Sequence, residues 1–543
     1  MLSRFGRRVS LLAGYFVPTL FVVAAPQPVA VLHLDRTALE VSFVADNFKE
    51  PVDLAFGPDG FLWCTELAGI VWRIDPTTDE RQEVLRLPEV FYRKSHGLLS
   101  LVHHPRFATE SWVYLHYVYQ VPSRGSDEIV RSRVVRCLWN GKTLGAPETI
   151  LEDIPGRSYH NGSRLVFGPD EKLYLTTGDA GEAMSAQDPA VLSGKVLRLN
   201  PDGTIPADNP TPGSPIWTLG HRNAQGLVFA PNGRVYASEH GPFNDDEVNL
   251  LERGRNYGWP VIEGFADRPD EIEASKDKSF TDPLRAWTPT VATSGLAYYD
   301  HPAIPEWHNT LLLANLKGRA LRVLELNTAG DHIDRERIFL QLRLGRLRDV
   351  VVAPTGDVYL LTSNTDWHPR FQPWMYEGLQ SGPDHIVRLH PVAATEAARL
   401  AATPGVAEWG EDLTPLPLMS ENWTFPATTE ALQAGQTLFA VHCAACHRPD
   451  GLGAPGLIPP LTNTDWVKAK NRLLQVVLHG LSGRIEVNGL PYEQEMPAFK
   501  HLSDDDLAAL LTFVRASFGN DSNAVIPSEV IEERKGLKEG GTR

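Results

Sequence analysis

A turn followed by an alternating strand recurs along the first 390 residues, and this repeat constrains the fold more than any other feature. Four clear copies begin at Phe56, Phe167, Phe229 and Val352, and two weaker ones at His104 and Pro305. Proline and glycine fix each turn, and the alternation of apolar residues is typical of a half-buried strand. Six copies spaced by roughly 45 to 75 residues indicate propeller blades with unequal insertions. We therefore predict an all-β, six-bladed β-propeller over residues 40–390.

Polar clusters flank these repeats, and a propeller would gather them at one mouth of its central channel. Each of these residues taken alone is more simply explained as solvated surface, but together they could form a site. Cations converging there would bind a compact polyanion. The Gly-Pro and Asp-Asp loops nearby could hold a hard cation such as Ca²⁺, and a histidine could act as a general base. The clusters are 159–165, 220–226, 239–247, Lys317, Arg346 and Arg348.

A second motif lies near the end of the chain, at Cys443-Ala444-Ala445-Cys446-His447. Two cysteines at this spacing can bond covalently to the haem vinyl groups, and the adjacent histidine then ligates the iron. Half of a zinc site has the same pattern, but no cysteine follows Cys446 to complete one. Met496 is the only methionine after the motif, and we predict it as the second axial ligand, with His479 and His501 as rivals. The sequence therefore predicts c-type haem and electron transfer.

The haem motif defines a second domain, which we expect at residues 429–520 as a small all-α cytochrome c of class I. Residues 431–442 have helical character, and Ser503 is a candidate N-cap for an apolar closing helix. Residues 391–428 are rich in Ala, Pro and Thr and are typical of a linker or strap. Residues 521–543 form a polar C-terminal tail.

The first 25 residues are typical of an export signal, because Arg4, Arg7 and Arg8 precede an apolar stretch that ends in small residues. Cleavage is expected after Ala25 or, alternatively, Ala30, and an uncleaved membrane anchor is the other interpretation. Either way, the folded part would lie in the periplasm, where c-type haem is attached. The net charge of −16 argues against nucleic acid and anionic membranes as partners. Membrane contact is expected only if the N-terminal segment is retained.

Two cysteines lie outside the haem motif, Cys64 and Cys137. They could pair in an oxidising compartment, and buried unpaired thiols are an equal alternative.

The polar clusters of the propeller resemble a known family. The runs His160-Asn-Gly-Ser-Arg-Leu-Val-Phe-Gly-Pro-Asp, Gly220-His-Arg-Asn-Ala-Gln-Gly-Leu, Glu239-His-Gly-Pro and Arg346-Leu-Arg-Asp-Val occur in the order found in soluble quinoprotein glucose/sorbosone dehydrogenases. Asp-Asp-Glu-Val-Asn and Asn-Tyr-Gly-Trp-Pro also match. The resemblance covers about residues 40–390. It implies a six-bladed propeller that uses pyrroloquinoline quinone (PQQ) with Ca²⁺.

The resemblance also implies roles for single residues. His160 would be the catalytic base, Asp179 the acid that orients it, and Arg222 a residue at the reacting centre. The backbone carbonyls of Gly241 and Pro242 would ligate the catalytic Ca²⁺. The implied PQQ contacts are Arg222, Asn223, Gln225, Lys317, Arg346 and Arg348.

Two positions depart from the family pattern. Ser95 stands where the best-known members have a glutamine near the substrate, and Tyr159 replaces an acid found before the histidine in glucose-oxidising members. Both lie on the substrate side, so they bear on which sugar is oxidised.

We therefore expect a dehydrogenase that oxidises an aldose or related polyhydroxy substrate and passes electrons through its own haem to a downstream cytochrome or respiratory acceptor. A sorbosone-type aldehyde or a non-sugar alcohol is an alternative substrate. A binding propeller without catalysis, with the cytochrome as its redox module, is an alternative of another class. The presence of His160, Arg222, Lys317, Arg346 and Arg348 argues against this last interpretation.

Overall fold

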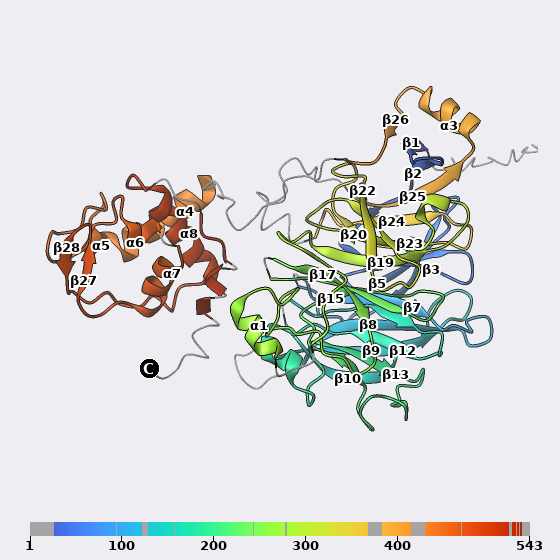
Figure 1. Cartoon of the computed structure of the whole chain (residues 1–543), viewed down its shortest axis with the longest axis horizontal. Coiled ribbons are helices and arrows are strands. Elements are labelled where there is room, and N and C mark those ends of the chain that lie inside the picture. The colour runs from blue at the N-terminus through green and yellow to red at the C-terminus, as the bar shows by residue number, and fades with distance from the viewer. Residues whose placement is uncertain are drawn as a thin grey trace, which may run out of the picture. The chain divides into compact units, whose positions relative to one another are not determined.

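The computed structural model of the chain has two compact units, divided between Leu418 and Met419 (Figure 1). The predicted export signal, residues 414–428 of the predicted linker and most of the predicted tail lie outside the described residues. Within the described part, no helix is long and apolar enough to cross a membrane. The described residues are 27–93, 95–121, 129–157, 159–242, 244–276, 280–366, 383–413, 429–468, 470–520, 524–527, 529–531 and 533–534.

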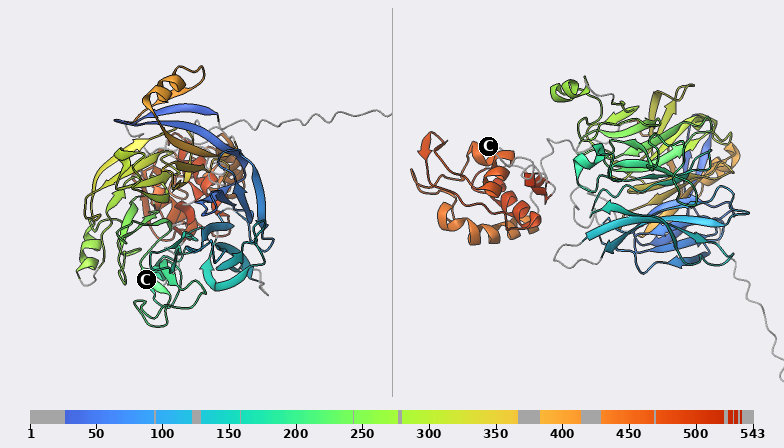
Figure 2. Two further views of the ribbon diagram at one scale, coloured as in Figure 1. Left: turned by 90° about the vertical axis from the view of Figure 1, so that its right-hand side faces the viewer. Right: turned by 90° about the horizontal axis from the view of Figure 1, so that it is seen from below.

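The first unit is a ring of six sheets around a central axis, each hydrogen-bonded in sequence order over most of its strands (Figure 2). Blade one comprises β3 (Pro51–Phe56), β4 (Leu62–Glu66), β5 (Ile70–Ile74) and β6 (Arg81–Arg86). Blade two comprises β7 (Leu98–His103), β8 (Trp112–Val121), β9 (Ile129–Leu138) and β10 (Glu148–Gly156). Blade three comprises β11 (Leu165–Phe167), β12 (Leu173–Thr176), β13 (Lys195–Leu199) and β14 (Ile216–Leu219).

The remaining blades follow the same plan, with one exception in blade six. Blade four comprises β15 (Ala224–Phe229), β16 (Val235–Glu239), β17 (Asp246–Leu251) and β18 (Arg285–Trp287), and α1 (Pro269–Ser275) lies between its last two strands. Blade five comprises β19 (Thr293–Tyr299), β20 (Thr310–Asn315), β21 (Leu321–Leu326) and β22 (Ile333–Phe339). Blade six takes β23 (Leu347–Val352), β24 (Val358–Thr362) and β25 (Asp384–Val392) from the end of the propeller.

The N-terminal strands complete blade six and close the ring. β2 (Ala38–Phe48) pairs antiparallel with β25, from Ala38 opposite Val392 to Phe48 opposite Asp384. β1 (Pro28–His33) pairs with β2 on its other side, so the propeller begins about a dozen residues before the predicted residue 40. Closure by strands from both ends of the domain leaves no open gap between the first and last blades.

The six sequence repeats coincide with the six blades, which confirms the predicted propeller. Each turn joins the first and second strands of a blade, as at β3–β4, β11–β12, β15–β16 and β23–β24. The two weaker copies join β7 to β8 and β19 to β20. The pattern is regular because the second strand, which follows the turn, is largely buried in every blade.

Apolar clusters fill the space between adjacent blades. Trp63 of blade one packs with Leu98 and Val113 of blade two, and Tyr174 of blade three packs with Leu227 of blade four. Full burial of one such aliphatic side chain stabilises the fold by about 1.5–3 kcal/mol. The core is therefore a ring of interfaces, which leaves the axis for polar side chains.

The segment expected as a linker begins with ordered elements. α3 (Ala394–Ala401) follows β25, and β26 (Ala407–Trp409) pairs in parallel with β1 at the outer edge of blade six. Residues 394–409 thus belong to the first unit.

The second unit is the predicted small helical domain, with a short two-stranded ribbon added. Gly435 on the first long helix faces the backbone carbonyl of Ala509 on the last, where a Cβ atom would lie 2.1 Å from the oxygen. Ser503 caps the last helix by accepting a 3.1 Å bond from the Asp506 amide, as its sequence position predicts. The elements are α4 (Thr429–His442), α5 (Ala444–His447), α6 (Asp465–Lys468), α7 (Lys470–His479), β27 (Ile485–Val487), β28 (Leu490–Tyr492) and α8 (Asp504–Ala516).

Candidate active site and haem site

The predicted propeller residues lie at one end of the sheets. His160 and Arg222 lie in the loops before the first strands of blades three and four, and Asp179 follows the second strand of blade three. Lys317 follows the second strand of blade five, and Arg346 precedes the first strand of blade six. Adjacent strands of a blade are antiparallel, so the start of the first and the end of the second lie at the same edge.

His160 and Asp179 form a hydrogen-bonded pair, with 2.8 Å between Nδ1 of the histidine and Oδ1 of the aspartate. His160 has a left-handed backbone conformation, φ 54°, and its carbonyl packs against Gly178. A Cβ atom at Gly178 would lie 2.0 Å from that carbonyl oxygen, so only glycine allows this approach. The bond to Asp179 favours the tautomer with its proton on Nδ1 and its lone pair on Nε2.

Asp179 is almost fully buried and bonded on both carboxylate oxygens. Oδ1 also accepts a 2.7 Å bond from the Gly181 amide, and Oδ2 accepts a 2.9 Å bond from the indole N–H of Trp259. Burial alone raises the pKa of Asp179, but His160, Arg222 and the Gly181 amide outweigh it and leave that pKa below its ordinary value. The carboxylate is therefore ionised, as an acid that orients an imidazole must be.

Trp259 is a site residue that the sequence analysis did not assign. Besides binding Asp179, its ring lies 5.2 Å from the guanidinium carbon of Arg222, within cation–π range. Trp259 and Arg222 line the same pocket. The Asn-Tyr-Gly-Trp-Pro run, which matches the family, contains Trp259. Because 80 residues separate Trp259 from Asp179, the sequence did not reveal that the two side chains meet.

Arg222 is held on both sides. Its backbone N–H bonds to the carboxylate of Glu239, and its Nη1 donates to the carbonyls of His240 at 3.1 Å and Gly241 at 2.8 Å. Nε is buried and has no hydrogen-bond partner among the described residues. A buried donor without a partner is costly, so an acceptor on a ligand at this point would be favourable.

The residues that follow Arg222 in the sequence connect its loop to other blades. The Asn223 side chain accepts a 3.0 Å bond from the Gly162 amide and so ties the loop before blade four to the loop that carries His160. Gln225 accepts a 3.0 Å bond from Arg348 of blade six through its side-chain oxygen. Asn223 and Gln225 thus connect the start of blade four to the loop of His160 and to the first strand of blade six.

The other predicted cations differ in exposure. Lys317 donates a 3.0 Å bond to Thr290, and burial lowers its pKa. Burial also lowers the pKa of Arg348, to about 10, which leaves it charged at neutral pH. Arg346 is the most enclosed, with its Nη2 2.6 Å from the Asp366 carboxylate and its Nε bonded to the Ser363 carbonyl.

The predicted Ca²⁺ ligands Gly241 and Pro242 line a pocket with several carboxylates. The Gly241 amide donates a 2.9 Å bond to Asp246, and a Cβ atom at Gly241 would lie 1.9 Å from the Asn244 carbonyl. The loop is therefore fixed with close backbone packing. Among the described residues, no group of three or more His, Cys, Asp or Glu side chains could hold a metal, so a cation here would depend on backbone carbonyls and the ligand.

These features fit PQQ, a compact polyanion with carboxylate and carbonyl acceptors. Arg222 supplies a buried unsatisfied donor, and Lys317 and Arg348 supply positive charge at the same end of the blades. The Gly241 carbonyl accepts one bond from Arg222 and has a second lone pair for a cation.

The two positions that depart from the family pattern lie close to the predicted base or in a neighbouring loop. The Tyr159 ring packs edge-on against His160, with 4.8 Å between the ring centroids. Ser95 is half-buried in the loop before blade two. A tyrosine in place of an acid removes a negative charge beside the base.

The haem motif comprises α5 and its N-cap, Cys443. Cys443 is half-buried, Cys446 is exposed, and the His447 ring is largely buried. Nδ1 of His447 lies 3.0 Å from the Pro459 carbonyl, so it donates that proton and leaves Nε2 for the iron.

Met496 packs at the edge of the same apolar cluster as Cys443. Its backbone forms two hydrogen bonds with Leu481, of 3.0 and 2.9 Å. The rivals His479 and His501 are both exposed, and His501 packs edge-on against His442. This geometry favours Met496 as the second axial ligand.

The remaining cysteines are free. Cys64 and Cys137 are buried in separate apolar clusters, and burial raises the pKa of Cys137 to about 12. They are unpaired thiols that pack as small apolar side chains.

Comparison with known proteins agrees with both units. The glucose/sorbosone dehydrogenase model matches residues 48–368, and the cytochrome c model matches residues 432–517. The chain is 31% identical over 403 residues to quinoprotein glucose dehydrogenase B of Acinetobacter calcoaceticus, a match that covers 59% of this chain and 84% of that protein.

Two further relatives match one unit each. The solved structure of the PQQ-bound form of aldose sugar dehydrogenase from Streptomyces coelicolor is 33% identical, with a TM-score of 0.56, and the match covers 65% of this chain and 98% of that one. Cytochrome c-552 of Thermus thermophilus is 37% identical over 93 residues, which cover 16% of this chain and 71% of that protein.

Proposed function

Since the chain belongs to the glucose/sorbosone dehydrogenase family and carries a cytochrome c domain, we propose that it is a periplasmic quinohaemoprotein sugar dehydrogenase. It would oxidise a hydroxyl of an aldose or related polyhydroxy substrate with PQQ and Ca²⁺, and pass the electrons to its own haem c and then to a respiratory acceptor. The observation that carries this proposal is the His160–Asp179 pair beside Arg222. The backbone N–H of Asp179 donates to the Arg222 carbonyl at 2.8 Å, so base and cation form one unit.

His160 would receive the proton of the substrate hydroxyl on Nε2. Asp179 holds the opposite nitrogen and stabilises the imidazolium that results. Trp259 holds the second oxygen of Asp179, which prevents the carboxylate from rotating away. The chain therefore supplies a base of fixed tautomer and orientation.

PQQ, when bound, supplies the acceptor for the hydride of the C–H bond, and Ca²⁺ makes it a better acceptor. Arg222, Asn223, Gln225, Lys317, Arg346 and Arg348 would hold PQQ, and the carbonyls of Gly241 and Pro242 would hold Ca²⁺. Their charges are matched to a polyanion, and the buried Nε of Arg222 would gain the acceptor it lacks.

The cytochrome on the same chain would provide the next electron acceptor. His447 and Met496 would hold the haem iron, and a thioether ligand would favour a high potential and leave no position open to oxygen, which suits electron transfer. Tethering keeps the haem at a high effective concentration for the reduced propeller. C-type haem is attached outside the cytoplasm, and this supports the periplasmic location.

Haem reduction by substrate tests the proposal. Full-length protein would be reconstituted with PQQ and Ca²⁺ and mixed with aldoses, polyols, aldehydes and simple alcohols, and the reduced haem would be followed by absorbance. We expect reduction by one substrate class, dependent on both PQQ and Ca²⁺, and loss of the response on chelation.

The controls separate the parts of the proposal. Reduction of an artificial dye without reduction of the haem would contradict the internal electron path and leave the dehydrogenase intact. Haem reduction by simple alcohols or aldehydes alone would show that these compounds, and not sugars, are the substrates. Silence of both dye and haem with every substrate would favour a binding propeller.

A further inference from the structure

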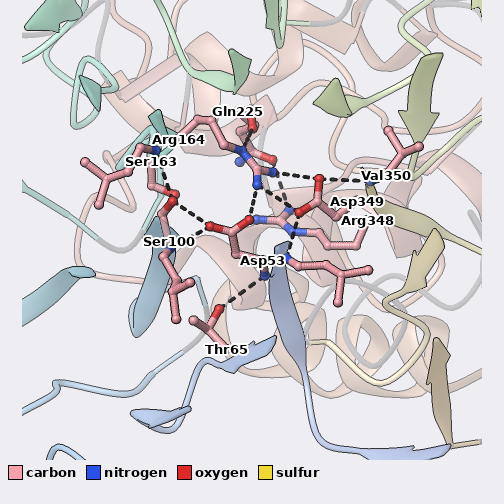
Figure 3. Close-up of polar contacts among 12 residues, drawn as sticks. Asp53, Thr65, Ser100, Ser163, Arg164, Gln225, Arg348, Asp349 and Val350 are labelled. Carbon is pink, nitrogen blue, oxygen red and sulfur yellow. Dashed lines mark hydrogen bonds and ion pairs between the residues drawn. The ribbon is translucent and has the colours of Figure 1, made fainter. Parts of the chain in front are cut away.

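A buried ion cluster lies at the centre of the propeller, outside the residues assigned above (Figure 3). The Arg164 guanidinium bridges two carboxylates from other blades, Asp53 of blade one and Asp349 of blade six. It binds Asp349 with two parallel bonds, of 2.8 Å from Nη1 and 3.0 Å from Nη2, and Nη1 also donates to Asp53. One arginine thus joins three blades at the axis.

The carboxylates of this cluster are fully bonded. Asp53 accepts a 2.6 Å hydrogen bond from the Ser100 hydroxyl of blade two and a 2.7 Å hydrogen bond from the Leu101 amide. Asp349 accepts 2.9 Å from the amide of Leu54. Both carboxylates are at most 2% exposed, and buried charge of this kind persists only when paired and hydrogen-bonded.

The same guanidinium connects to the predicted PQQ contacts. Its Nε donates a 3.1 Å bond to the backbone carbonyl of Gln225, while the side chain of Gln225 receives Nη1 of Arg348 at 3.0 Å. Arg348 is the residue before Asp349 on β23. Arg164 therefore holds the strand that carries Gln225 directly, and holds the strand that carries Arg348 through Asp349.

The loop of the predicted base is part of the same arrangement. Arg164 follows His160 by four positions, and its backbone amide donates a 2.8 Å hydrogen bond to the Thr176 hydroxyl. That hydroxyl in turn donates a 2.9 Å hydrogen bond to the backbone carbonyl of Ala224, the neighbour of Gln225. Blades three and four are thus fixed together beneath the candidate site.

We propose that Arg164 is the positioning residue of the PQQ pocket, and that its fork to Asp349 and its bond to Gln225 set the spacing between Gln225 and Arg348. The inference rests on the proposed function, because PQQ is the ligand whose contacts are positioned. Lysine cannot reproduce the role, since a single ammonium cannot form parallel bonds to Asp349 and reach Gln225 as well.

Arg198 provides a matched control in the same blade. It lies on β13, two strands away from β11, and its largely buried guanidinium lies between two carboxylates that are more exposed than Asp53 and Asp349. Its bonds run 2.8 Å to Asp170 and 2.9 Å to Asp208. Both clusters pair one arginine with two acids, and only Arg164 connects to predicted PQQ contacts.

The experiment measures PQQ binding to full-length protein by equilibrium dialysis with Ca²⁺ in excess. We expect the Kd for PQQ to rise about tenfold in Arg164→Lys and further in Arg164→Gln, as charge-assisted bonds are lost in steps. Arg198→Lys should keep the wild-type Kd. Thermal unfolding of the PQQ-free proteins reports the structural cost of each change separately. Ser100→Ala is a milder change in the cluster and should give a smaller rise in the Kd for PQQ.

The outcomes separate this inference from the proposed function. Failure of the wild-type protein to bind PQQ would contradict the proposed function and this inference with it. Wild-type binding with the same Kd in Arg164→Lys, or an equal rise in Arg198→Lys, would overturn the positioning role alone. If Arg164→Lys does not fold, an unchanged Kd in Ser100→Ala would overturn it equally.

Discussion

The two candidate sites of this protein are built in opposite ways. The predicted covalent haem contacts and one predicted axial ligand lie within five consecutive residues, 443–447, on one short helix and its cap. The candidate propeller site takes its residues from loops and strand ends of four blades, between His160 and Arg348. The first can therefore be recognised from a local motif, whereas the second depends on the closure of a ring. Changes in one unit should leave the other intact.

The largest expected effect comes from the predicted base. His160→Gln should lower substrate turnover by about 10²- to 10⁴-fold, because the hydroxyl proton loses its acceptor. Haem reduction by a chemical reductant should stay at the wild-type rate, since the cytochrome is a separate unit. Stopped-flow absorbance with substrate and with dithionite measures both, and unimpaired turnover would remove His160 from the mechanism.

Trp259→Phe tests the contact that connects two distant loops. The ring is kept and only the indole N–H to Asp179 is lost. A hydrogen bond to a charged group contributes about 1.5–3 kcal/mol, so turnover should fall by roughly 10- to 100-fold if the bond orients the base. Steady-state kinetics with a fixed PQQ load would show the loss in kcat, and a change confined to KM would assign Trp259 to substrate binding instead.

The converse test acts on the cytochrome alone. Gly435→Val should destabilise that unit by about 1–3 kcal/mol, because the added side chain meets the Ala509 carbonyl where α4 and α8 pack. Dye-linked dehydrogenase activity should be unchanged. Thermal melts followed by haem absorbance measure the effect, with Gln436→Ala on the exposed face of α4 as the control.

The smallest expected effect concerns the stability of the fold at acid pH. The pKa of Asp179 is lower in the folded protein than in the unfolded chain, so its ionised form stabilises the fold above the unfolded pKa of about 4. That contribution is lost as the pH falls through the folded pKa. The melting temperature of PQQ-free Asp179→Asn should therefore depend less steeply on pH below about 4 than that of wild type, and equal slopes would show that Asp179 contributes nothing there.

The sequence predicted the features that depend on local chemistry. Six turn-and-strand repeats gave the number of blades, because each blade needs the same turn and the same alternation of buried side chains. The Cys-x-x-Cys-His motif gave the haem, because the spacing of the thiols is fixed by the porphyrin. The roles of the Gly-Pro loop and of the histidine of blade three came from the family resemblance of the runs that contain them.

Only the tertiary structure decided how distant residues meet. The start of the propeller depended on the pairing of β2 with β25, some 350 residues later, and of β1 with β2, which no local pattern at residues 28–48 reveals. The bond from Trp259 to Asp179 and the bridge from Arg164 to Asp53 and Asp349 likewise join loops and strands of separate blades. A single arginine in a sequence has no visible partner, because its partner is fixed by ring closure and by the need to neutralise buried charge.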